Sequence, residues 1–327
     1  MAGSGLLVQL VQDFSKKQGA RSFDESWSTM REIGLFQPAL VEHGISDLCV
    51  VLTELSRVDC GLAVALFSHW AAVEVLRCAG SDFMAVAPES VFAFPPFQSP
   101  AEFKGFQVVE RDGKALLSGK IESVVLAGHA SHVVIAGYLL PLAGGAVKLI
   151  THVRTLGLRS CPHVDILMDQ APAVKLGGAD LFIHMSDRMS LAAASVALGI
   201  AQGSMDEAVR YSKTRKQGGK EIFRWSEVKM LLGEMLVQLQ TGTLALAQAC
   251  AAADARTSGW ERDAAAVAIS LQEMACTLTS DGIQVLGGAG YTTEFKQEQR
   301  FRDTFHTQHL LGLHPVRKLR LPDRWLA

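Results

Sequence analysis

The sequence has few cysteines, and none is spaced to bind a metal or to form a redox pair. The six cysteines include no C-x-x-C pair and stand in apolar or small-residue surroundings: Cys49, Cys60, Cys78, Cys161, Cys250 and Cys276. We therefore expect buried or idle thiols in a reducing compartment. The histidines of the central region lack ligand spacing as well (His129, His132, His152 and His163), and we expect no metal site.

An excess of charge of one sign is also missing. The 31 basic and 33 acidic residues nearly cancel, and no run of Lys or Arg stands out. The sequence thus offers no basic surface for nucleic acid or an anionic membrane. No apolar run reaches the roughly 18 residues of a membrane span, and residues 1–17 lack the pattern of a secretory signal. We expect a cytoplasmic protein.

The residue patterns divide the chain into three regions. With 49% hydrophobic residues, 327 residues are enough for two or three compact units around a shared core. Residues 1–87 carry apolar positions at helical spacing, residues 88–180 alternate short β-branched runs with turns, and residues 181–327 are helical again and rich in alanine. The sequence therefore predicts N-terminal helices, a small β domain and a C-terminal helical bundle.

The β region can be divided further from its turn residues. Asp112-Gly113 and Ser118-Gly119 are typical of turns between short antiparallel strands. Further strands are expected at residues 146–153, 156–161 and 164–169, where β-branched and apolar residues alternate with others.

The C-terminal region carries the most specific pattern. Residues 261–308 contain an Ala-rich helix, a QVLGGAGY turn and an RD continuation, and they resemble the C-terminal bundle of acyl-CoA dehydrogenases without gaps. Residues 198–222 are similar to the preceding helix of that family, which ends in an R-x-x-F-G turn. Residues 27–36, 52–76 and 118–137 resemble its first helices and its middle domain more weakly. The resemblance covers nearly the whole chain.

This resemblance implies both a fold and an activity. The fold is mainly α with a small β domain: N-terminal helices, a middle β-barrel-like domain and a C-terminal four-helix bundle. In the family these bundles pack into dimers and tetramers, and FAD sites straddle the interface. The activity is α,β-desaturation of an acyl-CoA thioester, with an electron-transfer flavoprotein or a similar acceptor taking the electrons.

Four residues match the family's cofactor-binding pattern. Gly287 and Gly288 lack side chains, so that backbone N–H groups can approach an anion. In the family this turn, with Gln284, is similar to the part that holds the pyrophosphate and adenosine end of an FAD in the neighbouring subunit. Arg215 would supply a guanidinium to the same pyrophosphate. Taken alone, such glycines often only turn a helix corner, but the surrounding match favours the cofactor.

The family's catalytic base is missing. The α-proton of a thioester is weakly acidic, so the base must lie against the α-carbon in a dry site. Members commonly carry this Glu in a Q-I-Y-E-G-T pattern, and the matching position here is Leu311. A minority carry it at the start of the long helix, where this chain has Met189. His309 and His314 flank Leu311 and can act as bases near neutral pH, but their side chains point differently.

The part of the pattern that surrounds the flavin ring is altered as well. Residues 95–103, PPFQSPAEF, replace the family's E-P-G-A-G-S-D-like loop, and residues 123–125, SVV, replace its W-I-T. Gly218 stands in place of the aromatic residue of R-x-x-F-G. The resemblance therefore implies that what remains is the half of a site that would serve a flavin held mainly by another chain.

The function that the sequence predicts is the non-catalytic partner subunit of a heteromeric acyl-CoA dehydrogenase, sharing FAD with a related chain. Such complexes handle fatty or bulky acyl groups, such as those derived from steroids or rings. Two alternatives stay open. One is a homo-oligomer of this fold that binds acyl-CoA without flavin chemistry. The other is an active dehydrogenase with a relocated base such as His309.

Overall fold

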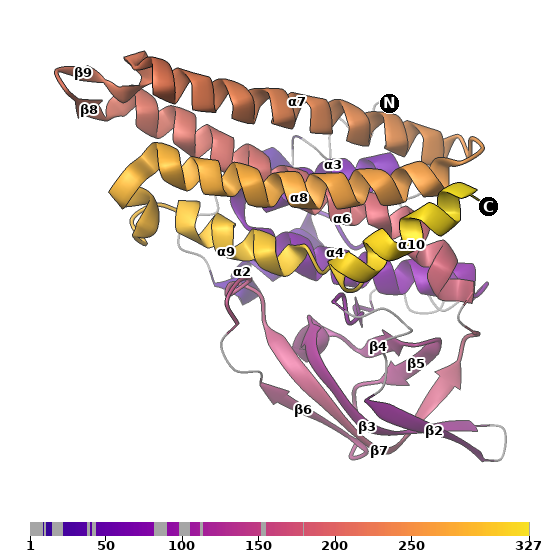
Figure 1. The fold of residues 1–327 in the computed structure, drawn as a ribbon. Helices are drawn as coiled ribbons and strands as arrows, with labels where there is room; N and C mark the ends of the chain where they lie inside the picture. The colour runs from indigo at the N-terminus through magenta and orange to yellow at the C-terminus, as the bar shows by residue number, and fades with distance from the viewer. Residues whose placement is uncertain are drawn as a thin grey trace.

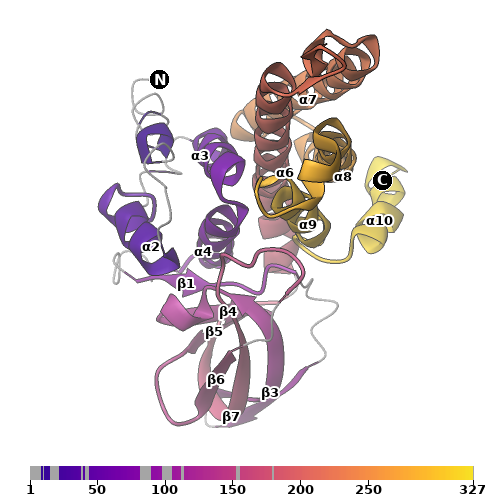
Figure 2. The same cartoon turned by 90° about the vertical axis from the view of Figure 1, so that its left-hand side faces the viewer.

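The computed structural model describes residues 9, 11–14, 22–37, 40, 44–81, 90–97, 105–111, 114–151, 155–178 and 180–326. The predicted turn at residues 112–113, most of the 95–103 loop and His152 lie outside these residues. The N-terminal helices stand beside the C-terminal bundle, and the β domain lies beneath both (Figure 2). The predicted fold class, mainly α with a small β domain, is confirmed.

The N-terminal helices are α2 (Phe23–Glu32), α3 (Ile45–Val58) and α4 (Cys60–Cys78). Helix α2 begins with a capping box, in which Ser22 Oγ accepts from the Glu25 N–H and the Glu25 carboxylate accepts from the Ser22 N–H. Helix α4 is buried along almost its whole length.

The β domain is a seven-stranded sheet in the order β1-β4-β5-β7-β3-β2, with β6 also paired to β7. Its strands are β1 (Phe92–Ala93), β2 (Phe106–Arg111), β3 (Lys114–Val125), β4 (His132–Ile135), β5 (Tyr138–Pro141), β6 (Val147–Thr151) and β7 (His163–Lys175). All pairings are antiparallel except β1 with β4. The predicted strands at residues 146–153 and 164–169 correspond to β6 and to part of β7.

Two local predictions in this domain are wrong. Residues 156–161 form a turn, because Leu158 adopts a left-handed conformation (φ +55°) that a strand cannot continue. The pair Ser118-Gly119 does not end a strand, since β3 runs through it with a bulge. Gly119 has φ +140°, and a Cβ there would lie 2.3 Å from the carbonyl oxygen of Gly105, so only glycine fits.

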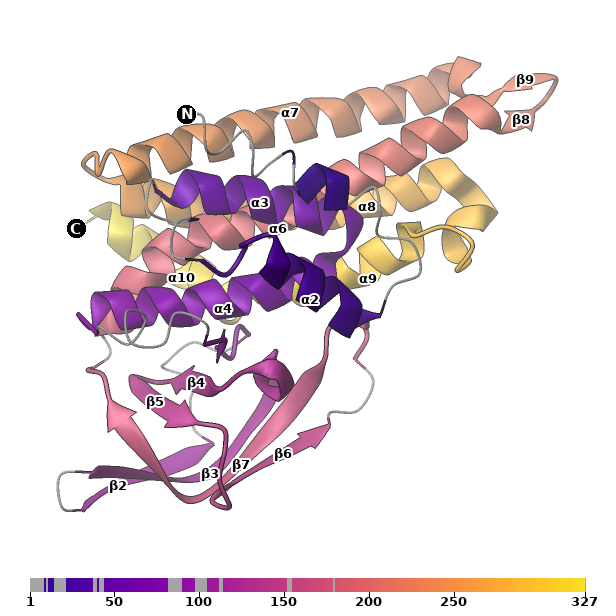
Figure 3. The same cartoon turned by 180° about the vertical axis from the view of Figure 1, so that it is seen from behind.

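The C-terminal region consists of five helices and a small hairpin. The helices are α6 (Asp180–Thr214), α7 (Ser226–Asp254), α8 (Trp260–Leu286), α9 (Gln297–Thr307) and α10 (His314–Leu326). The hairpin strands β8 (Lys216–Gln217) and β9 (Lys220–Glu221) connect α6 to the short 3₁₀ helix η4 (Ile222–Arg224) and α7 (Figure 3). A second 3₁₀ helix, η5 (Gly287–Tyr291), follows α8.

The long helix α6 packs closely on α3 because it carries glycines at the contact. A Cβ added at Gly199 would lie 2.2 Å from the Thr53 carbonyl oxygen, and one at Gly203 would lie 2.4 Å from that of Arg57. The Ser56 hydroxyl also donates to the carbonyl of Val196 across this contact. The small residues of α6 thus join the N-terminal helices to the bundle.

Among the residues that the structure describes, two helices have the length and hydropathy of a membrane span, although the sequence pattern indicated none. The 18-residue window of α4 is 94% buried inside the protein, as expected of a core helix, and that of α7 is only 22% buried. Helix α7 therefore presents apolar residues on the surface.

Candidate functional site

Three segments that are distant in the sequence meet where the β domain joins the helices. The N–H of Leu311, just after α9, donates a 2.7 Å hydrogen bond to the carbonyl oxygen of Pro96, just after β1. The centroid of the Phe97 ring lies 4.4 Å from that of His306 on α9 and 6.2 Å from that of His163 on β7. These segments are among those that the resemblance assigns to the flavin ring and the base. We call Phe97, His163 and His306 the ring cluster.

The two positions that the sequence resemblance assigns to the base lie in one apolar core. The Leu311 side chain is 6% exposed and that of Met189 is 1% exposed, and both belong to the same buried cluster as Leu310 and Phe182. Neither side chain can accept a proton. The proton transfer that the family performs has no carboxylate at either position of this chain.

The two histidines that flank Leu311 have different surroundings. His314 is 6% exposed at the start of α10, and its Nε2 lies 3.2 Å from Glu273 Oε1 on α8. His309 lies close enough to His306 to lower its pKa by charge repulsion, although burial is the larger cause. A hydrogen bond to the Gly157 carbonyl opposes both effects. The His306 imidazole is therefore neutral at neutral pH.

His163 is oriented by polar contacts within the β domain. Its Nδ1 lies 3.0 Å from Ser123 Oγ, and the Ser123 N–H donates to Asp165 Oδ1 at 2.9 Å. Lys120 Nζ lies 2.9 Å from the other oxygen of Asp165. Sequence reasoning treated His163 as a scattered histidine and missed this role. The available signal was the two-residue spacing of His163 and Asp165, which puts both on one face of a strand.

Strained backbone surrounds the same junction. Ser123, Leu126, Leu158 and Leu311 all have φ between +55° and +70°, where non-glycine residues are uncommon. In each case a hydrogen bond holds the N–H group, and the acceptor for Leu126 is the Pro162 carbonyl. Strain of this kind persists only where the surrounding structure fixes it, and it is concentrated at functional sites.

A buried carboxyl group holds the turn before β7. Asp303 on α9 accepts a 2.6 Å hydrogen bond from the Leu158 N–H and is 1% exposed. Burial raises its pKa to about 7, and the nearby charge of Asp59 adds to the rise, while the bond from Leu158 opposes it. Asp59 itself caps α4 and accepts from the Ser160 hydroxyl in the same turn.

The predicted cofactor residues all lie at one end of the C-terminal bundle (Figure 1). Arg215 follows α6, Gln284 is in the last turn of α8, and Gly287 and Gly288 come next; all four are exposed. A Cβ added at either glycine would meet no atom within 4 Å, so the space above both is open to a ligand. The carboxyl end of α8 repels anions, so attraction must come from cations such as Arg215, which forms no ion pair with the described residues.

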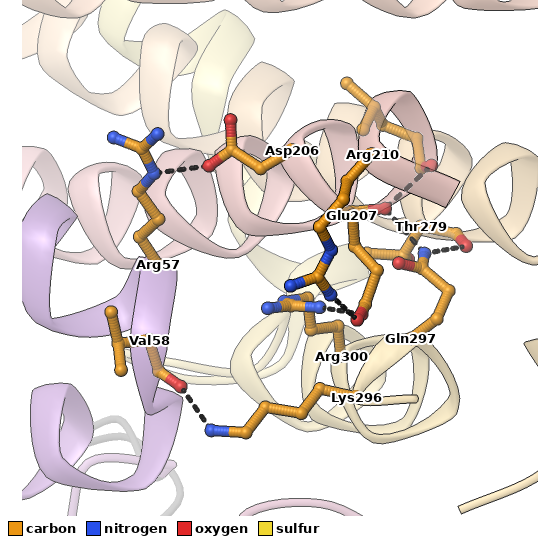
Figure 4. A network of polar contacts seen from close by, with 11 residues as sticks. Arg57, Val58, Asp206, Glu207, Arg210, Thr279, Lys296, Gln297 and Arg300 are labelled. Atoms are coloured by element: carbon orange, nitrogen blue, oxygen red, sulfur yellow. Dashed lines mark hydrogen bonds and ion pairs between the residues drawn. The ribbon is translucent and has the colours of Figure 1, made fainter. Parts of the chain in front are cut away.

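The helices behind this end are fixed by a buried polar network (Figure 4). Glu207 on α6 pairs with Arg300 on α9 at 2.5 Å and with Arg210 at 2.8 Å, and it is only 6% exposed. Gln297 donates to the Thr279 carbonyl on α8 at 3.0 Å. Helices α6, α8 and α9 are thereby held together behind the residues that are predicted to bind the cofactor.

Comparison with known proteins identifies a family for the C-terminal half. Residues 177–319 match the sequence profile described as acyl-CoA dehydrogenase, C-terminal domain. Subunit CarC of the caffeyl-CoA reductase-Etf complex of Acetobacterium woodii is 28% identical over 176 residues, 52% of this chain and 46% of CarC. Probable acyl-CoA dehydrogenase FadE25 of Mycobacterium tuberculosis is 34% identical over 123 residues, 38% of this chain and 32% of that protein. In these alignments the chain spans less than half the length of the curated relatives.

Solved structures share the whole fold. Butyryl-CoA dehydrogenase from Megasphaera elsdenii matches with a TM-score of 0.89 and 18% identity, over 99% of this chain and 98% of that one. A variant of the Tcur3481-Tcur3483 steroid ACAD matches with a TM-score of 0.84 and 19% identity, over 99% and 98% of the two chains. At these identities the likeness establishes the fold, and the acyl-CoA dehydrogenase fold expected from the sequence is confirmed.

Proposed function

Given that this chain belongs to the acyl-CoA dehydrogenase family, we propose that it is the partner subunit of a heteromeric, flavin-dependent acyl-CoA dehydrogenase. In this proposal a second, related chain carries the base and holds most of the FAD, and the present chain completes the nucleotide end of that site. The observation that carries the proposal is the contrast between the two halves of the site in this chain.

The half that would surround the flavin ring does not fit a cofactor in this chain. The N–H of Leu311 donates a hydrogen bond to the carbonyl of Pro96, and the Phe97 ring packs against His306. Both base positions are apolar and buried in the same core. A chain built in this way has no group at those positions to take the α-proton of a thioester.

The other half fits the anionic, nucleotide end of FAD. The open space above Gly287 and Gly288 allows a close approach to their backbone, and the guanidinium of Arg215 is available to a pyrophosphate. When bound, the flavin would accept the hydride that leaves the β-carbon of the acyl group. The role of this chain is limited to binding and orienting the nucleotide end.

An exposed apolar face on α7 supports the proposal that a partner chain binds. Met230, Leu236, Val237 and Leu244 have between 52% and 67% of their side chains exposed, on a helix that has the hydropathy of a membrane span. Exposed apolar area of this kind is typical of subunit interfaces. We propose that the bundle of the catalytic chain covers this face.

The names of two similar proteins support a proposed electron acceptor and a proposed substrate class. CarC is named as a subunit of an Etf complex, which supports an electron-transferring flavoprotein as the acceptor for the proposed complex. The Tcur3481-Tcur3483 protein is named as a steroid ACAD, which supports a bulky acyl-CoA as the substrate.

The test is the visible spectrum of the chain, produced alone and then together with a neighbouring acyl-CoA dehydrogenase chain that keeps the Glu. The expected result is a colourless protein alone and a yellow complex that oxidises acyl-CoA. Arg215→Ala should lower the FAD content of the complex, whereas Arg256→Ala, which changes an exposed arginine after α7, should not.

A colourless homo-oligomer that binds a CoA thioester would favour the flavin-free alternative. FAD bound by the chain alone and bleached by acyl-CoA would favour a relocated base such as His309.

A further inference from the structure

The outer face of α7 carries a line of apolar side chains. Met230, Val237 and Leu244 follow one another at seven-residue intervals, which on a helix places them on one face. They are 67%, 67% and 63% exposed. Figures 1 and 2 place α7 at the edge of the bundle that is farthest from the β domain. We call these three residues the α7 stripe.

One charged residue interrupts the α7 stripe. Glu234 is exposed and lies one turn from Met230 and from Val237, so its carboxylate is on the same face. Residues 230–253 contain no other charged residue. Any chain that covers the α7 stripe must therefore also cover this carboxylate.

The packing of α7 on α8 places a second carboxylate beside the first. The two helices are antiparallel neighbours, and a Cβ added at Gly242 would lie 2.5 Å from Leu271 Cδ2 and 3.0 Å from Met274 Sδ on α8. Moving two turns back along α7 and two turns forward along α8 from this contact leads to Glu234 and Asp281. In agreement, burial raises the pKa of the Asp281 carboxyl, and the charge of Glu234 raises it further.

The chain itself supplies no cation to this pair. Neither carboxylate forms an ion pair with a residue that the structure describes. Residues 230–253 and 263–286, which make up nearly all of α7 and α8, contain no Lys or Arg. The cations at the ends of these helices, Lys229 and Arg262, each lie over an aromatic ring of the same chain.

These charges decide which kind of chain can cover the α7 stripe. A second copy of this chain, related by a two-fold axis, would present the same two helices and hence no cation between their ends. Both carboxylates would then be buried without a partner, which is costly. A different chain with Lys or Arg at the facing position would pair with them instead.

We propose that the α7 stripe binds the bundle of a catalytic chain that presents a Lys or Arg to Glu234 and Asp281, and that the two carboxylates exclude a second copy of this chain. The inference rests on the proposed function and deepens it, because it names the chemistry by which the partner is chosen. The apolar side chains supply affinity, and the carboxylates supply specificity.

Paired substitutions in the full chain test the carboxylates. Glu234→Gln with Asp281→Asn removes both charges, and we call it the neutral variant. Glu227→Gln with Asp263→Asn makes the same change in net charge in the first turns of the same two helices and serves as the control variant. Circular dichroism checks that each variant is folded.

The first readout is the affinity for the catalytic chain of the proposed complex, measured by titration calorimetry with FAD present, at low and at high salt. The neutral variant should bind at least about thirtyfold more weakly at low salt, since the partner's cation is left unpaired. It should also lose most of the salt dependence, because no attraction remains to be screened. The control variant should bind as the wild-type chain does.

The second readout is self-association of each chain alone, measured by sedimentation equilibrium. The neutral variant should self-associate at least about tenfold more tightly than the wild-type chain, with residues 230–244 protected from amide hydrogen exchange. The control variant should behave like the wild-type chain. Equal self-association of the wild-type chain and the neutral variant would overturn the exclusion of a second copy.

The outcomes separate this inference from the proposed function. A yellow, active complex that the neutral variant forms with an affinity within twofold of the wild-type value overturns the recognition of a cation and leaves the partner-subunit proposal intact. If the wild-type chain forms no complex, the partner-subunit proposal fails together with the recognition of a cation. The self-association readout still decides in that case whether the carboxylates keep copies of this chain apart.

Discussion

Asp303 and Leu158 join the C-terminal bundle to the β domain through one hydrogen bond. The carboxyl group on α9 accepts the N–H of Leu158 at 2.6 Å, and this bond holds the left-handed turn that leads into β7. His306, one turn further along α9, accordingly lies beside the start of β7, where its ring centroid is 5.5 Å from that of His163. The ring cluster depends on this connection.

The raised pKa of Asp303 predicts how stability changes with pH. Its pKa is about 7 in the folded protein, against an unfolded value of about 4, so folding favours the protonated form. The resulting stabilisation is fully present below about pH 4 and is lost as pH rises through about 7, by roughly 2–4 kcal/mol. Denaturant unfolding of the wild-type chain should therefore give a lower midpoint at pH 8 than at pH 5.

Asp303→Asn should remove most of this dependence, because an amide oxygen still accepts the Leu158 N–H and carries no charge. Asp206→Asn, which changes an exposed carboxylate paired with Arg57, is the control and should keep the wild-type slope. An unchanged slope in Asp303→Asn would show that another group causes the dependence.

The buried pair of Glu207 and Arg300 should matter far more to stability than an exposed pair beside it. Arg300→Leu leaves the 6%-exposed Glu207 with only the exposed Arg210, and we expect a loss of about 2–4 kcal/mol in the free energy of unfolding. Arg57→Leu breaks the more exposed pair with Asp206 and should cost less than about 1 kcal/mol. Equal costs in urea unfolding would contradict the difference in burial.

Restoring a carboxylate at residue 311 should not restore catalysis in this chain alone. Leu311 is 6% exposed in an apolar core, so Leu311→Glu buries an unpaired carboxyl group and should destabilise the protein by about 2–4 kcal/mol. The variant should show no oxidation of acyl-CoA with an artificial electron acceptor. Leu313→Glu changes a side chain that is 49% exposed and should be nearly neutral in stability. Activity in Leu311→Glu alone would mean that this chain holds a complete flavin site.

The elements that could be predicted from the sequence are those whose signal is local. The Ala-rich stretches and the QVLGGAGY turn predicted α6, α8 and the end of the bundle, because helix periodicity and glycine turns depend on neighbouring residues. The assignment of the family's base positions to Leu311 and Met189 rests on single positions of the sequence and stays a prediction. The assignment of Arg215 and Gln284 to FAD stays a prediction.

The ring cluster could not be predicted, because its members come from three separate elements. Phe97, His163 and His306 share no spacing in the sequence, and only the packing of the β domain on α9 brings them together. The turn at Leu158 was mistaken for a strand, since Asp303, far away in the chain, imposes its left-handed conformation. The contact between Trp225 and Gly218 could not be predicted either, because a contact across a hairpin leaves no periodic pattern in the sequence.

The exposed face of α7 should decide whether a partner chain binds. Val237 and Leu244 are 67% and 63% exposed, so Val237→Asp with Leu244→Asp places two charges on the proposed interface without disturbing the core. The variant should fold normally, as judged by circular dichroism, but lose copurification with the catalytic chain and hence the yellow colour. Leu319→Asp, on α10 at 76% exposure, removes similar apolar area elsewhere and should keep the complex. If the α7 variant still copurifies, the partner binds another surface, whereas loss of the complex in both variants would point to a general effect of added charge.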